Sequence, residues 1–297
     1  MTLDDSSAAF AAARAVAAAH GIGCDHAAVI AAGSNVLVHM RPASVIARVM
    51  TGTAALHEDI AQWLEREVAV GVFVAARGGP VVPPSRLLAP GPYQRDGFWM
   101  TFWQFVEHDT SEPPPNASEV GRSLRQLHAV LADFSGELES LGAMRDDIEG
   151  QLFELRPRDW LTGQVIDLLH SELQRLAPLV FETFLPAQPL HGDASLSNLL
   201  GTRTRLLWND LEDVCTGPVA WDIAGLVDSA RARDQSEQYV DELLRAYDGP
   251  DLEELQPFIA AHALFAAVWQ TFQAQRGPRA RTHAPSRLTQ WRKQFGG

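Results

Sequence analysis

Three side chains with oxygen donors lie near one another in the sequence and could carry chemistry. The segment LHGDASLSNLL holds Asp193 and Asn198, and LLWNDLED follows with Asp210. A carboxylate can orient an attacking hydroxyl, while a carboxylate and an amide oxygen together suit Mg²⁺. Phosphoryl transfer needs this combination of groups. We therefore expect Asp193 to face the hydroxyl, and Asn198 and Asp210 to hold the metal.

Two short apolar strands are expected to position these groups. Residues 198–200 (NLL) and 205–209 (RLLWN) are apolar and lie close together in the chain. A hairpin of these two strands would bring Asn198 and Asp210 to the same end of the hairpin.

The N-terminal third of the chain alternates between strand and helix patterns. Runs rich in β-branched residues predict strands, and apolar residues at helical spacing, from Leu56 to Phe73, predict a helix that ends at Gly78-Gly79. An aromatic run at 98–105 predicts the second of two later strands. The expected early strands are residues 27–32, 35–40 and 44–50.

The rest of the chain is mostly helical by pattern. Residues 109–119 (DTSEPPPNASE) are polar and rich in proline, which is typical of a linker. Beyond them, the motif segment 187–211 interrupts a series of helices. The helices expected from their apolar spacing are 117–133, 160–185, 221–233, 236–248 and 251–276.

Composition limits the class of partner. The chain has 24 basic and 37 acidic residues and a net charge of −13. Nucleic acid is therefore not expected as a partner, because phosphate backbones require Lys and Arg. An acidic surface is compatible with a cationic substrate, although it can equally serve solubility alone. Lys293, near the C-terminus, is the only lysine, so any cationic role in mid-chain must fall to arginine.

The sequence gives no sign of secretion or membrane insertion. Two isolated cysteines, Cys24 and Cys215, form neither a disulfide framework nor a paired zinc motif. The Ala-rich N-terminus carries Asp4 and Asp5 in place of a basic region and predicts an amphipathic helix. No apolar run reaches the ~18 residues of a membrane span. We expect a cytoplasmic protein that does not partner with membranes.

The motifs resemble those of the aminoglycoside phosphotransferase family. HGDASLSN matches that family's HGDxxxxN catalytic loop, and LLWNDLED resembles its strand-borne aspartate motif. The resemblance extends over residues ~25–275 in the family's order. The further segments that carry it are GSNVLVHM (33–40), VIARV (45–49), WLEREVAV (63–70), FWMTFWQFV (98–106), EVGRSLRQLHAVL (119–131) and PVAWDIAGLV (218–227).

The resemblance implies an α+β, two-lobed protein-kinase-like fold. Residues 1–106 are expected to form a strand-rich nucleotide-binding lobe with one long helix. Residues 107–297 are expected to form a mainly helical lobe that carries catalysis and the acceptor site. The implied activity is transfer of the γ-phosphoryl group of ATP or GTP, with Mg²⁺, to a hydroxyl of a small acceptor. An aminoglycoside-type antibiotic is the first candidate, and an amino alcohol, amino sugar or other metabolite is the alternative.

The resemblance also assigns roles to individual residues. Asp193 is the catalytic aspartate, Asn198 and Asp210 are metal ligands with Glu212 as an additional one, and His191 and Asp222 support the loop. Arg48 stands where the family usually has lysine, and Glu67 is its expected partner. The other expected contacts are Ser34, Asn35, Gln104 and Val106 for the nucleotide, and Asp228, Trp269 and Gln273 for the acceptor.

Other interpretations of the same residues remain open. Asp193 could be a simple turn residue, and Arg48 a surface arginine on an edge strand. The acids from Asp193 to Asp213, together with His191, could form a transition-metal site. The chain could also be a nucleotide-binding pseudokinase that acts as a partner module. The oligomeric state is not predicted.

Overall fold

The computed structural model describes residues 3–52, 59–108, 115–276 and 284–295. The chain folds into two compact units. The first comprises Met1–Glu112, Asp133–Glu137 and Leu199–Asp213, and the second comprises Pro113–Ala132, Leu138–Asn198 and Val214–Gly297. Most of the predicted linker, residues 109–114, lies outside the described residues, as does Leu56 of the predicted helix.

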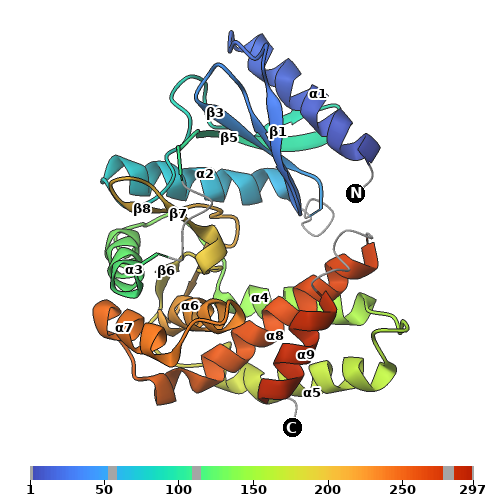
Figure 1. Ribbon diagram of the computed structural model, residues 1–297, viewed down its shortest axis with the longest axis vertical. Helices are drawn as coiled ribbons and strands as arrows, with labels where there is room; N and C mark the ends of the chain where they lie inside the picture. Colours follow the sequence, from blue (N-terminus) through green and yellow to red (C-terminus); the bar gives the residue numbers. More distant parts are fainter. Residues whose placement is uncertain (1–2, 53–58, 109–114, 277–283, 296–297) are drawn as a thin grey trace. The chain divides into compact units, whose positions relative to one another are not determined.

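The first unit contains an antiparallel sheet with the strand order β1-β2-β3-β5-β4 (Figure 1). Arg48 lies in β3, which pairs with β2 on one side and β5 on the other, so its backbone is held by both neighbours. The four strands predicted with bounds are confirmed within one or two residues as β1, β2, β3 and β5, and β4 is the further strand expected before the aromatic run. Their bounds are β1 Ala28–Ala32, β2 Asn35–His39, β3 Val45–Met50, β4 Tyr93–Arg95 and β5 Phe98–Gln104.

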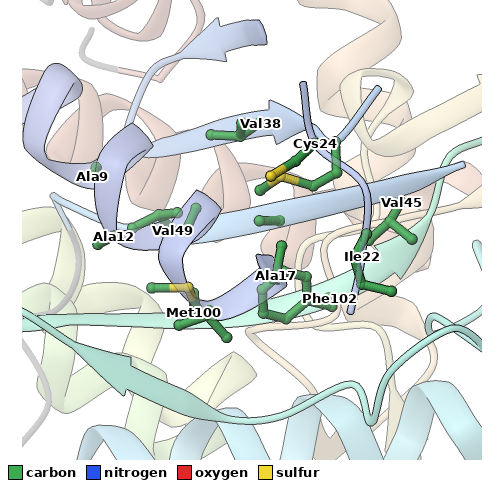
Figure 2. Close-up of a cluster of buried hydrophobic side chains, with 14 of the residues drawn as sticks. Ala9, Ala12, Ala17, Ile22, Cys24, Val38, Val45, Val49, Met100 and Phe102 are labelled. Carbon is green, nitrogen blue, oxygen red and sulfur yellow. The ribbon is translucent and has the colours of Figure 1, made fainter. Parts of the chain in front are cut away.

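Helix α1 (Leu3–Ala19) packs on this sheet through alanines. Ala9, Ala12 and Ala17 recur at helical spacing and are fully buried. Figure 2 shows them beside Val38 and Val49 of the sheet. Because alanine side chains are small, the helix backbone can approach the strands closely.

Helix α2 (Ile60–Ala76) carries Glu67, which is buried. It begins at Asp59, whose carboxylate accepts a hydrogen bond from the Gln62 amide at 3.0 Å. The predicted helix is thus present, and its packing against β5 places Glu67 within reach of the sheet.

The expected hairpin of the motif segment is also present in the first unit. Strand β7 (Leu199–Gly201) pairs with β8 (Leu206–Trp208) in antiparallel fashion. The Trp208 amide donates to Pro80 O and its carbonyl accepts from the Val82 amide, both at 2.8 Å. These bonds tie the hairpin to segment 80–82 and so fix the chain that leads to Asp210 and Glu212.

The second unit is mainly helical, with one small sheet of β6 (Gln188–Leu190) and β9 (Cys215–Gly217). Two helices, α4 and α9, were not expected from the sequence. Gly142 and Gly150 lower the helix propensity of α4. Both α4 and α9 pack against α8. The helices are α3 Ala117–Leu131, α4 Leu141–Glu154, α5 Gly163–Val180, α6 Ala220–Ala232, α7 Glu237–Tyr247, α8 Leu252–Arg276 and α9 Ala284–Phe295.

The expected fold class, a strand-rich N-terminal part and a helical C-terminal part, is confirmed. Among the described residues, no helix combines the length and apolar character that crossing a membrane requires.

Candidate active site

Arg48 is the centre of a buried ion cluster in the first unit. Its side chain is only 7% exposed. Nη1 donates to both carboxylate oxygens of Glu67, at 2.9 and 3.0 Å. On the other side, Nη2 contacts Glu212 and lies 2.8 Å from Asp210 Oδ1. The ion pair with Glu67 expected from the sequence is therefore present, and the guanidinium connects it to both acids of the second motif.

Negative charge exceeds positive charge in this cluster. One guanidinium faces the three carboxylates of Glu67, Asp210 and Glu212. Burial raises the pKa of Glu67 to about 7, with Asp210 adding to the effect and the charge of Arg48 opposing it. Burial lowers the pKa of Arg48, but the charges of Asp210 and Glu67 raise it by more, so the guanidinium stays charged.

The donor set around Asp210 suits a hard cation. Asp210 Oδ1 is buried and accepts no hydrogen bond of good geometry from the described residues. Its oxygen and that of Glu212 converge on one cationic nitrogen, Arg48 Nη2. Mg²⁺ binds hard oxygen ligands, commonly one or two carboxylates together with waters, so these two acids are candidates to hold it in place of the guanidinium nitrogen. Asp210 also has φ of 62°, a left-handed conformation that is uncommon outside glycine and recurs at functional sites.

The residues predicted to contact the nucleotide have defined places in the first unit. Ser34 O, in the turn between β1 and β2, accepts from the Gly52 amide at 2.7 Å. Asn35 is buried, and with its amide oxygen facing the guanidinium it accepts from Arg48 Nη2 at 2.9 Å. Gln104 ends β5, and Val106 follows two residues later, half-buried.

The HGD turn of the second unit is held by Asp222, at the start of α6. Its Oδ1 accepts from the Gly192 amide at 2.9 Å and its Oδ2 from the His191 amide at 2.8 Å. Trp221 Nε1 donates to Gly192 O at 2.6 Å. Gly192 has φ of 88°, a conformation that a side chain disfavours. The backbone support that the sequence analysis expected from Asp222 is therefore present.

The support continues away from the loop. Asp222 is fully buried, and His128 Nε2 lies 2.8 Å from its Oδ2. His128 Nδ1 in turn lies 2.7 Å from the Tyr247 hydroxyl. Burial raises the pKa of Asp222, but His128 and the loop amides lower it by more, so the carboxyl remains ionised. The sequence analysis did not find His128 or Tyr247, because they join Asp222 from helices distant in the chain.

Asp193 and Asn198 are close to each other in the same unit. Asn198 Nδ2 donates to Asp193 Oδ2 at 2.8 Å and to Asp193 O at 2.9 Å. Because the amide nitrogen faces Asp193, the amide oxygen of Asn198 points elsewhere and can bind a metal. Burial raises the pKa of Asp193, but His262, His191 and Asn198 lower it by more, so the net pKa is below the ordinary value.

Two residues near Asp193 were missed by the sequence analysis. His262, on α8, places Nε2 3.8 Å from Asp193 Oδ1 and Nδ1 3.2 Å from Asp228 Oδ2. Arg287, on α9, also contacts Asp228 Oδ2. His262 is one of ten histidines and lies in an apolar stretch of α8, residues 259–268, so no local motif identifies it. Arg287 belongs to a helix that was not predicted.

The three residues expected at the acceptor lie on α6 and α8. Asp228 is 3% exposed and bound by protein partners, which favours a structural role over direct contact with an acceptor. Trp269 is half-buried and stacks on Phe272. Gln273 is half-buried, and its Nε2 has no hydrogen-bond partner among the described residues.

The structure thus brings the predicted residues together in two groups. Arg48, Glu67, Asp210 and Glu212 gather in the first unit, and Asp193 and Asn198 lie together in the second. The described parts of the chain contain no group of three or more His, Cys, Asp and Glu side chains arranged to hold a metal ion.

Comparison with known proteins identifies similar chains. The model of the phosphotransferase enzyme family matches residues 34–258. No curated protein sequence matches. An amicoumacin kinase is 11% identical with a TM-score of 0.74, and the alignment covers 99% of this chain and 97% of that one. A choline/ethanolamine kinase family protein from Mesorhizobium loti is 20% identical with a TM-score of 0.63, over 99% and 94% of the two chains.

A third solved structure is similar as well. An aminoglycoside 2'-phosphotransferase is 15% identical, with a TM-score of 0.60 over 92% of this chain and 93% of that one. At these identities the likeness establishes the fold, and it confirms the kinase-like architecture expected from the motifs.

Proposed function

The chain belongs to the phosphotransferase enzyme family, and we propose that it transfers the γ-phosphoryl group of ATP or GTP, with Mg²⁺, to a hydroxyl of a small cationic acceptor. Membership makes it a small-molecule kinase that acts on a hydroxyl group. The cofactors, the residue roles and the acceptor are the proposed parts.

Similar structures support the choice of cofactors. The amicoumacin kinase was solved with AMP-PNP and Ca²⁺, and the aminoglycoside 2'-phosphotransferase with GDP. In this chain, the acids around Asp210 and the amide oxygen of Asn198, whose amide nitrogen faces Asp193, are the groups we assign to Mg²⁺. When bound, the metal neutralises charge on the transferred phosphate.

The observation that carries the proposal is the cluster in which Arg48 joins Glu67 to Asp210 and Glu212. Arg48, held by Glu67, is the cation we assign to the phosphate oxygens, which would take the place of the carboxylates that now contact its Nη2. Ser34, Asn35 and the main chain at Gln104 and Val106 complete the nucleotide site in this proposal. We assign the nucleotide to residues 1–106, and the catalytic loop and acceptor site to residues 107–297.

Asp193 is the group we assign to the acceptor. Its carboxylate is ionised, because its pKa lies below the ordinary value. An ionised carboxylate accepts a hydrogen bond from the attacking hydroxyl and orients it toward the phosphorus. We assign His191 and Asp222 a supporting role, because Asp222 accepts hydrogen bonds from the loop backbone at His191 and Gly192.

Net charge supports a cationic acceptor. With 37 acidic against 24 basic residues, the field of the protein attracts cations. An aminoglycoside-type antibiotic fits, which would make the protein a resistance enzyme. The alternative is metabolic phosphorylation of an amino alcohol or amino sugar, and the similarity to a choline/ethanolamine kinase family protein favours it equally. Trp269 and Gln273 are the proposed acceptor contacts.

A coupled ADP-release screen tests the proposal. Purified protein with Mg–ATP is offered a panel of aminoglycosides, amino alcohols, amino sugars and neutral sugars, and the same panel is repeated with GTP. We expect acceptor-dependent release with one cationic class and none with Asp193→Asn. If nucleotide binds but no hydroxyl compound is phosphorylated, the pseudokinase interpretation replaces this proposal.

A further inference from the structure

His262 lies between two carboxylates in the second unit. Its Nδ1 is 3.2 Å from Asp228 Oδ2, and its Nε2 is 3.8 Å from Asp193 Oδ1. The imidazole is 3% exposed, and its Nε2 makes no hydrogen bond to the described residues. Leaving a buried ring nitrogen without a hydrogen bond costs folding free energy. The orientation of Nε2 toward Asp193 therefore requires an explanation.

The position of Asp228 determines which ring nitrogens carry protons. A carboxylate accepts hydrogen bonds, so Nδ1 must donate to Asp228. In a neutral ring, Nε2 would then present its lone pair to the Asp193 carboxylate, which is repulsive. In the imidazolium form, Nε2–H faces Asp193 instead, and both contacts are favourable. The geometry therefore selects the charged form.

The charges around the ring balance only in that form. The catalytic loop contributes Asp193, α6 contributes Asp228 and α9 contributes Arg287, which binds Asp228. His191, from the loop, acts on Asp193 through its electrostatic field. With a neutral ring, Arg287 would be matched to Asp228 and Asp193 would lack a cation among these three groups, whereas the imidazolium matches the two acids with two cations.

The fold leaves room for the ring at a specific place. A Cβ on Gly225 of α6 would lie 2.8 Å from His262 Nε2 and 2.6 Å from Ala194 O, so only glycine lets α6, the loop and the ring meet. The rings of Trp221 and Phe265 flank the imidazole at centroid distances of 5.4 and 5.8 Å. The ring is thus enclosed on several sides, and its orientation is fixed.

We propose that His262 is a positioning residue for phosphoryl transfer, whose imidazolium holds Asp193 ionised and correctly oriented and ties it to the Asp228–Arg287 ion pair. The proposal rests on the role of Asp193 proposed above. Asp193 then acts by orienting the acceptor hydroxyl more than by taking its proton, since a neighbouring cation makes a carboxylate a weaker base. Asp228 supports the catalytic loop through His262.

The pKa of the imidazole agrees with this geometry. Burial lowers it, but Asp193 and Asp228 raise it by more, to about 9. His262 is therefore charged at neutral pH and loses its proton only in alkaline solution. The rate of a wild-type enzyme should fall as pH rises through about 9.

Two isosteric variants separate the contacts of the ring. In His262→Asn, the amide nitrogen occupies the place of Nδ1, so the bond to Asp228 is kept and the contact with Asp193 is lost. In His262→Gln, the amide nitrogen reaches the place of Nε2 and can donate to Asp193 without a charge. Thr271→Val is the matched control, because Thr271 is buried on the same helix and, among the described residues, its hydroxyl donates to Ala267 O in its own turn.

We expect His262→Asn to lower kcat on the order of 10–100-fold, the range seen when a group that orients a site residue is removed. KM for ATP should stay unchanged in His262→Asn. The kcat of His262→Gln should lie between those of His262→Asn and the wild type, and the kcat of Thr271→Val should match the wild type. The alkaline fall in kcat should disappear in both His262 variants, which loss of packing alone would not cause. Circular dichroism checks that each variant is folded.

A second measurement needs no His262 variant. NMR titration of the imidazole in the wild type and in Asp193→Asn should show a lower His262 pKa in the variant, because one of the two carboxylates loses its charge. An unchanged pKa would overturn the proposal. So would a His262→Asn enzyme with wild-type kcat and pH profile while Asp193→Asn is inactive. If Asp193→Asn itself is fully active, the proposed function fails instead, and the NMR result still reports on the ion pair.

Discussion

The two compact units balance their buried charges in different ways. In the first, Arg48 alone faces Glu67, Asp210 and Glu212, which leaves an excess of negative charge. In the second, Asp193 and Asp228 are matched by His262 and Arg287. An acidic excess favours the arrival of a further cation, whereas a balanced cluster needs none and fixes geometry instead.

This difference suits the two tasks of a phosphotransferase. In the proposed function, the first cluster binds and releases a metal–nucleotide complex, because its carboxylates gain a partner when the cation arrives. The second cluster is proposed to keep one carboxylate in one orientation through the reaction. The comparison can be tested by removing charge from each cluster in turn and asking whether binding or turnover responds.

The largest effect is expected from Asp193→Asn. The amide keeps the shape of the side chain and removes the charge that orients the hydroxyl, so turnover should fall on the order of 10²–10⁴-fold. Affinity for Mg–ATP should be nearly unchanged, because Asp193 is not in the cluster assigned to the metal. Steady-state kinetics and calorimetry measure the two quantities. Wild-type turnover in this variant would show that the HGD turn is structural only.

Arg48→Ala should have the next largest effect, and it should lower the free energy of unfolding as well as the affinity for nucleotide. It leaves Glu67, which is 1% exposed, without its cation, and breaking a buried pair costs about 3–5 kcal/mol. Urea unfolding measures this loss. Arg48→Lys should recover part of it, since lysine keeps the charge on a single nitrogen. Arg95→Ala removes an exposed arginine of the same sheet as a control. Equal stability of the two alanine variants would contradict the central place given to Arg48.

Asp210→Asn should weaken Mg–ATP binding. The variant removes one carboxylate from the metal cluster, and the loss should be on the order of 10–100-fold in affinity. Calorimetry with ATP, with and without EDTA, measures it: the wild type should bind well only with the metal, and the variant should show a smaller difference. A wild type that binds ATP equally well in EDTA would remove the metal role from Asn198 and Asp210.

The motif residues could be predicted from the sequence because they lie in two short segments. The same is true of the strands, whose β-branched and aromatic runs are local signals. His262 and Arg287 could not be predicted, because their meaning comes from contacts between α6, α8, α9 and the loop. Helix α4 was missed although Met144, Ile148 and Leu152 recur at helical spacing, because its glycines weaken the local signal and packing supplies the rest.

Gly225→Ala tests the close approach on which the balanced cluster depends. The added methyl would meet Ala194 O at 2.6 Å and His262 Nε2 at 2.8 Å, so the loop or the ring must move. Overpacking of this kind costs about 1–3 kcal/mol. Gly150→Ala is the control: nothing lies within 4 Å of its Cβ, and it should stabilise helix α4 by about 0.5–1 kcal/mol. If urea unfolding showed both variants shifted in the same direction from the wild type, the close approach at Gly225 would be contradicted.

The smallest effect at neutral pH concerns the protonation of His262. Its folded-state pKa of about 9 lies above its ordinary value of 6.5, so the stability it contributes is fully present below pH 6.5 and is lost as pH rises through about 9. Within that window the free energy of unfolding should fall on the order of 1 kcal/mol per pH unit. His262→Gln, which cannot titrate, should lack this slope. Thr271→Val offers the contrast, because it removes no titrating group and should keep the slope of the wild type. Urea unfolding at intervals from pH 6 to 10 measures all three proteins, and a slope shared by His262→Gln would assign the pH dependence to another group.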